Sequence, residues 1–196
     1  MKACSEVCIV GNGASLLGRG LGQAIDEHEC VVRFNEFKIV GFEQDVGRRT
    51  SVWFYNRDSE HPSIVSRLTQ FRPVRMFVHE WNIADTAPLK LDALIKQAGT
   101  GTQAARVQKT FLKEMSDFLG ERYSMWSSGA IAAWILLKEY PCVTLAGFDW
   151  WHKPDKFHYM NEQKFHYLPT RGHQPAVEKR FFDLLAAAGK VRFLYE

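Results

Sequence analysis

The feature that constrains this fold most is an apolar run that leads directly into Gly11, Asn12 and Gly13. Residues 7–10 are all apolar, which is typical of a strand that is covered on both faces, as in a parallel sheet. A tight turn at the carboxyl end of such a strand is where open α/β sheets bind ligands. We therefore expect this loop to hold the phosphate of a nucleotide.

The rest of the chain repeats the alternation of strands and helices, with a polar, glycine-punctuated loop expected at residues 40–50. At 196 residues, one domain covering 1–196 is the default. The pattern predicts an α/β fold with a mostly parallel sheet and helices on both faces. We expect strands at residues 7–10, 30–35, 51–56, 74–79, 142–148 and 191–195, and helices at 23–28, 63–71, 89–97, 103–119, 130–139 and 175–188.

Charge and cysteine content narrow the class of protein. A net charge of +3 is too weakly basic to indicate nucleic acid as a partner, and it is compatible with an anionic substrate or membrane surface. The four cysteines contain no CxxC pair, and we expect buried, reduced thiols. The sequence shows neither a signal peptide nor an apolar run long enough to span a membrane. We expect a cytoplasmic protein. Peripheral association with the inner membrane stays open, and so does the question of whether the chain is truncated.

The motifs argue against two common enzyme classes and against a metal. The glycines match neither the GxGxxG dinucleotide fingerprint with its later acidic residue nor the GK[ST] of a P-loop. His158, His166 and His173 are eight and seven residues apart, which is wider than the usual ligand pairs of zinc sites. We expect no metal and no cofactor, with hydrogen bonds from Asn, His, Tyr and backbone N–H groups neutralising the phosphate.

Two helix starts carry candidate chemistry. Residues 127–129, Ser-Ser-Gly, open an apolar helix and offer hydroxyl and backbone N–H groups to an anion. His173 stands just before the last helix, and Glu178 follows it by five positions. His173 could act as a general base, although a capping or surface role is the commoner fate of such a histidine. Glu178 could orient His173 or pair with Lys179 or Arg180.

Taken together and in chain order, these segments resemble the sialyl motifs of the sialyltransferases, glycosyltransferase family 29. Segments within residues 8–50 resemble the large motif, and residues 127–148 resemble the small motif. The His-Tyr pair at 158–159 resembles the third motif, and His173 with Glu178 resembles the very small motif. The bacterial sialyltransferases of family 42 show a second resemblance, through their Gly-Asn-Gly-x-Ser loop and Arg-x-Asn strand end.

The resemblance implies a single Rossmann-like domain of the GT-A type that uses a CMP-sugar and inverts the anomeric carbon without metal. Asn12 and Asn35 would contact the donor's phosphate and nucleotide. Ser128 and Gly129 would meet the sugar carboxylate or the ribose. The full donor-binding set that we expect is Gly11, Asn12, Gly13, Ser15, Asn35, Ser127, Ser128, Gly129, Asp149 and Tyr159.

The same resemblance assigns the catalytic roles. His173 would be the base that deprotonates the acceptor hydroxyl, and His158 would hydrogen-bond or protonate the leaving phosphate, with His166 as its rival. Family 42 uses tyrosines on the phosphate where tryptophans stand here, and Tyr159, Tyr167 or His158 could replace them. Animal members link the large and small motifs by a disulfide, for which Cys8 and Cys142 lie near the expected places.

The expected function is therefore transfer of sialic acid, or of a related ulosonic acid such as Kdo, from its CMP-sugar to a glycan or glycolipid. A bacterial surface glycan such as lipooligosaccharide is the expected acceptor. Two other readings stay open. The chain could be a binding module for nucleotide or glycan without turnover, or an unrelated α/β enzyme such as a nucleotide hydrolase.

Overall fold

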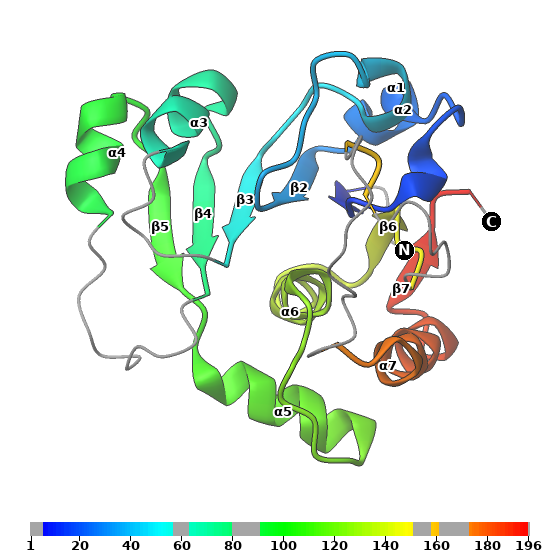
Figure 1. Cartoon of the computed structure of the whole chain (residues 1–196). Coiled ribbons are helices and arrows are strands. Elements are labelled where there is room, and N and C mark those ends of the chain that lie inside the picture. Colours follow the sequence, from blue (N-terminus) through cyan, green and yellow to red (C-terminus); the bar gives the residue numbers. More distant parts are fainter. Residues whose placement is uncertain (1–5, 57–62, 80–90, 151–157, 161–172, 196) are drawn as a thin grey trace.

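The computed structural model describes residues 6–56, 63–79, 91–150, 158–160 and 173–195. Within these ranges seven parallel strands form one sheet in the order β5-β4-β3-β2-β1-β6-β7 (Figure 1). The strands are β1 (Val7–Val10), β2 (Cys30–Phe34), β3 (Val52–Tyr55), β4 (Arg75–Val78), β5 (Gln103–Arg106), β6 (Val143–Ala146) and β7 (Val191–Phe193). The helices are η2 (Ala14–Leu16), α1 (Gly22–Asp26), α2 (Glu43–Val46), α3 (Ser63–Phe71), α4 (Asp92–Ala98), α5 (Lys109–Leu119), α6 (Ser128–Leu136) and α7 (Pro175–Ala187).

Helices cover both faces of the sheet, as the sequence pattern predicts (Figure 1). Successive side chains of β1 show why, because side chains of a strand alternate between the two faces. Val7 and Ile9 pack in the cluster that contains α5, α6 and α7. Cys8 and Val10 pack in the cluster that contains α1 and α2. A strand buried on both faces needs apolar residues throughout, which explains the continuous run in the sequence.

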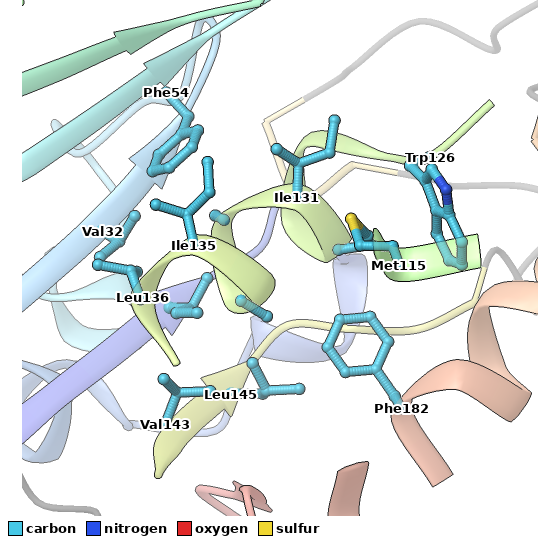
Figure 2. Packing of buried hydrophobic residues seen from close by; sticks show 14 of the residues in the cluster. Val32, Phe54, Met115, Trp126, Ile131, Ile135, Leu136, Val143, Leu145 and Phe182 are labelled. Carbon is cyan, nitrogen blue, oxygen red and sulfur yellow. The ribbon is translucent and has the colours of Figure 1, made fainter. Parts of the chain in front are cut away.

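The larger core is built around α6, which is apolar on nearly every side. Figure 2 shows Ile131, Ile135 and Leu136 of this helix among side chains of the sheet and of the neighbouring helices. Burying one such side chain contributes about 1.5–3 kcal/mol. The start of α6 is therefore held firmly at the edge of the sheet where the strands end.

The structure corrects the expectation of one helix over residues 103–119. Gln103–Arg106 is instead the edge strand β5, and the helix begins at Lys109. The Gln103 N–H donates to the carbonyl oxygen of Val74 at 3.0 Å, and Val107 N–H donates to that of Val78 at 2.9 Å. An edge strand with exposed positions lacks the apolar alternation of a buried strand, so pairing with β4 decided this segment.

The expectation of an irregular loop at residues 40–50 is also corrected, because this segment contains the short helix α2. Its C-terminal side is folded back against α1. The Asp26 carboxylate accepts the backbone N–H of Arg48 at 2.7 Å. The buried guanidinium of Arg33 donates to the carbonyl oxygen of Val46 at 2.6 Å. These side chains order a segment whose own sequence only predicts turns.

The cysteines differ in state. Cys8 and Cys30 are free thiols, and burial raises the pKa of Cys8 to about 12. Cys142 is disulfide-bonded, and its partner is not among the residues that the structure describes. The expectation of reduced thiols is therefore wrong for Cys142, and the pairing of Cys8 with Cys142 does not form. None of the helices in the described ranges combines the length and the apolar character that crossing a membrane requires.

The sheet order creates a switch point between β1 and β6. From β1 the sheet grows through β2 to β5 in one direction, whereas β6 and β7 extend it in the other. Open α/β sheets bind ligands in the crevice outside the carboxyl ends of the strands at such a point. The Gly-Asn-Gly loop follows β1 at this place, directly beside the segment that follows β6.

Candidate functional site

The two glycines of the first loop are required by the segment that follows β6. Gly11 N–H donates to the carbonyl oxygen of Ala146 at 2.7 Å, and Gly13 N–H donates to that of Gly147 at 3.0 Å. A Cβ on Gly11 would overlap the carbonyl of Gly147, and one on Gly13 would lie 2.5 Å from the carboxylate of Asp149. Gly13 has φ −63° and ψ 142°, which any residue can adopt. Space, and not backbone conformation, therefore selects glycine at these positions.

Asn12 lies between these glycines and is half-buried. Its amide Nδ2 lies 3.5 Å from the carbonyl oxygen of Phe34 at the end of β2. Its own carbonyl oxygen accepts the N–H of Tyr159 at 2.9 Å. The side chain of Asn12 is thus held at the carboxyl edge of the sheet.

Asn35 lies at the same edge, but its side chain has a local partner. The residue adopts φ +50°, a left-handed conformation that asparagine tolerates better than most residues. Its Oδ1 accepts the N–H of Asn56 at 3.1 Å, and its carbonyl oxygen accepts the indole N–H of Trp53 at 2.9 Å. These bonds tie the end of β2 to the end of β3.

His158 and Tyr159 meet the same loop from the other side. His158 forms an antiparallel bridge with Gly13. Burial lowers the pKa of His158, and Asp149 partly opposes that shift, so the imidazole is mainly neutral at pH 7. Tyr159 is 1% exposed, and its hydroxyl donates to the carbonyl oxygen of Lys38 at 2.6 Å. The structure therefore places His158 beside the first loop. The hydroxyl of Tyr159 is already used in a hydrogen bond to the backbone of Lys38.

The start of α6 is the second part of the site. Ser127 caps this helix by accepting the N–H of Ala130 at 3.2 Å. Ser128 and Gly129 are half-buried in its first turn. A Cβ on Gly129 would lie 2.7 Å from the ring of Phe148, which follows β6. Because Phe148 precedes Asp149, this contact brings the helix start next to the first loop.

A buried carboxylate joins the start of α6 to the start of α7. Glu178 is 1% exposed. Its Oε1 accepts the N–H of Ser127 at 2.8 Å, and its Oε2 accepts the Ser127 hydroxyl at 2.5 Å. The same Oε1 lies 3.5 Å from Nδ1 of His173. Glu178 therefore contacts both helix starts that the sequence predicts to carry chemistry.

The surroundings of His173 fix its tautomer. Nδ1 lies 2.8 Å from the carbonyl oxygen of Met125, which can only accept, so Nδ1 carries a proton. In the neutral imidazole the lone pair is then on Nε2. Glu178 raises the pKa of His173 against the opposing effect of burial. A half-buried imidazole in this state can accept a proton at Nε2 and is stabilised as a cation when it does.

The structure thus brings most of the predicted residues to one edge of the sheet. The first loop, Asp149 and His158 meet at the switch point, and Phe148 connects them to the start of α6. Glu178 in turn joins the start of α6 to His173. Ser15 and Asp149 bind one another. Glu178 contacts Ser127 as well as His173, whereas the sequence predicted only that it could orient His173 or pair with Lys179 or Arg180. Its position in the first turn of the last helix, close to His173, was the sequence signal for a role at this site. His166 and Tyr167 lie outside the described residues.

In the described part of the chain, His, Cys, Asp and Glu side chains do not gather in any group of three or more that could hold a metal ion. The metal-free reaction stays a prediction.

Comparison with known proteins decides the family. The profile of glycosyltransferase family 29, the sialyltransferases, matches residues 1–190. The chain belongs to this family. This chain is 27% identical over 201 residues to the mouse CMP-N-acetylneuraminate-beta-galactosamide-alpha-2,3-sialyltransferase 2. The match covers 97% of this chain and 57% of that protein. It therefore spans a little over half the length of that relative.

A shorter match reaches higher identity. It is 49% over 51 residues of the mouse alpha-N-acetyl-neuraminyl-2,3-beta-galactosyl-1,3-N-acetyl-galactosaminide alpha-2,6-sialyltransferase, covering 26% of this chain and 14% of that protein.

Solved structures show the same fold. A mammalian sialyltransferase in complex with Gal-beta-1-3GalNAc-ortho-nitrophenol matches with a TM-score of 0.65 and 22% identity, over 96% of this chain and 68% of that one. The Campylobacter jejuni sialyltransferase CstII, in complex with the substrate analogue CMP-3FNeuAc, matches with a TM-score of 0.55 and 16% identity, over 95% and 78%. The seven-stranded α/β sheet of this chain thus has the fold seen in these two structures.

Proposed function

We propose that this chain carries the catalytic machinery of a sialyltransferase, which moves sialic acid from CMP-sialic acid to a hydroxyl group of a glycan. The observation that carries the proposal is the contact of one buried carboxylate, Glu178, with both His173 and the N-cap of α6. Membership of family 29 supplies the reaction class. We further propose the GT-A type for the fold, which the single parallel sheet supports.

The reaction would be a single displacement at the anomeric carbon. The acceptor oxygen forms the new bond, the bond from that carbon to the phosphate oxygen breaks, and CMP leaves. The acceptor proton goes to Nε2 of His173, whose Nδ1 proton is held by the carbonyl oxygen of Met125. Glu178 stabilises the imidazolium that results. Attack opposite to the leaving group inverts the anomeric carbon.

The donor would lie across the switch point. The amide of Asn12 and the backbone N–H groups at the start of α6 supply hydrogen bonds for the phosphate and the sugar carboxylate, because the first turn of a helix has N–H groups without partners in the helix. Ser128 adds a hydroxyl. His158, mainly neutral, would donate a hydrogen bond to the leaving phosphate. This arrangement provides for an anionic donor without a metal ion.

Replacing Asn12 with alanine is expected to weaken CMP binding by about tenfold, the cost of roughly one hydrogen bond to a charged group. The exchange removes the amide and leaves the backbone bonds of the loop in place. Isothermal calorimetry with CMP measures the effect. An unchanged affinity would refute the role of Asn12.

The proposed function is tested by measuring CMP release from CMP-sialic acid with a galactosyl acceptor, since relatives are named for galactosyl acceptors. We expect acceptor-dependent release that persists after chelation of divalent metals with EDTA. CMP-Kdo as donor and a lipooligosaccharide as acceptor form the comparison arms. CMP binding without turnover on any donor would indicate a binding module. Equal binding of CMP, UMP and AMP would indicate an unrelated enzyme.

A further inference from the structure

The segment after β6 reaches across the switch point with one side chain, that of Asp149. Its Oδ2 accepts the backbone N–H of Ser15 at 2.8 Å, and its Oδ1 accepts the Ser15 hydroxyl. Both carboxylate oxygens are therefore engaged on one residue of the first loop, 134 positions away in the sequence. Such charge-assisted hydrogen bonds are stronger than bonds between neutral groups.

The same carboxylate lies directly against the first loop. Gly13 lies so close to Asp149 that a Cβ on Gly13 would be 2.5 Å from the carboxylate oxygen. Backbone bonds from Gly11 and Gly13 to residues 146–147 add to this attachment. The first loop and the segment after β6 therefore pack tightly together, with Gly13 of the loop against the carboxylate of Asp149.

Asn12 projects from the middle of this loop. On one side its neighbours are attached to the segment after β6, and on the other its carbonyl oxygen is bound by Tyr159 N–H. Its amide points toward the end of β2. Any movement of the loop away from Asp149 would move this amide relative to the start of α6.

We propose that Asp149 is a positioning residue of the donor site, which holds the first loop so that Asn12 meets the donor. This inference rests on the proposed function. It also changes the part expected of Asp149, because its oxygens are committed to Ser15 and its contribution to donor binding passes through Asn12.

The decisive experiment is a double-mutant cycle on CMP affinity, measured by calorimetry for wild type, Asn12→Ala, Asp149→Ala and the double variant. We expect Asp149→Ala alone to weaken CMP binding by about tenfold, comparable to loss of one charged hydrogen bond. In the Asn12→Ala background it should cost less than about threefold, because residues that act through one another are not additive. Full additivity, or an unchanged affinity of the single variant, overturns the proposal.

Asp149→Asn is the matched conservative variant. The asparagine oxygen can accept the Ser15 N–H while its amide donates to the Ser15 hydroxyl, which can also accept. We therefore expect CMP affinity within about threefold of wild type, and a loss equal to that of alanine overturns the proposal. Ser15→Ala should lie between the two. Thermal unfolding identifies any variant that fails to fold, and then the asparagine and Ser15 variants decide.

This design separates the inference from the proposed function. If wild type fails to bind CMP, the proposed function is wrong. If wild type binds CMP and the cycle is additive, only the role of Asp149 is wrong.

Discussion

Replacing His173 with alanine is expected to lower the turnover number for sialyl transfer by about 10²–10⁴-fold, the usual contribution of a positioned general base. The reason is geometric. Nδ1 of this imidazole lies 2.8 Å from the carbonyl oxygen of Met125, so Nε2 is the atom that can take the acceptor proton. The side chain is 30% exposed, so its loss leaves the core intact. The measurement is CMP release at saturating donor and acceptor.

Two controls separate chemistry from binding and folding. CMP affinity of the His173→Ala variant should stay within about threefold of wild type, because the base acts on the acceptor. Gln174→Ala, at the next position, changes an exposed side chain that makes no capping bond and should keep full activity. Full activity in the His173 variant would exclude it as the base.

Replacing Glu178 is expected to disturb both the base and the helix start. In Glu178→Gln the negative charge that raises the pKa of His173 is lost, so that pKa falls. The base must be neutral to act, and the acid limb of kcat/KM reports its pKa in the free enzyme. The limb should therefore move to lower pH, while the plateau falls because the weaker base accepts a proton less readily. The measurement is the pH profile of kcat/KM.

Glu178→Ala goes further, because it leaves the N–H and hydroxyl of the half-buried Ser127 without their acceptor. We expect a loss of about 1–3 kcal/mol in the free energy of unfolding, measured by denaturant. Asp183→Asn is the matched control on the same helix, since that carboxylate is exposed and pairs with Lys179. An unmoved acid limb in Glu178→Gln would show that Glu178 does not act on the base.

Most of the sheet could be predicted because buried parallel strands carry their own signal. Val7–Val10 is apolar on both faces, Val143–Ala146 is apolar except for Thr144, and a glycine follows each run. β5 could not be predicted, because Gln103–Arg106 is an edge strand whose formation depends on hydrogen bonds to β4. Likewise, α2 depends on Asp26 and Arg33, which lie outside it.

The candidate site divides in the same way. The sequence by itself determined which residue types stand after the strands and before the helices, because strand ends and helix starts are local features: Gly-Asn-Gly, the Ser-Ser-Gly helix start and His173. Only the tertiary structure decided what these residues touch. It uses the glycines to make room for residues 147–149, engages Tyr159 on Lys38, and places Glu178 between Ser127 and His173. The physical reason is that space and hydrogen-bond partners depend on segments far apart in the chain, which only the packed sheet brings together.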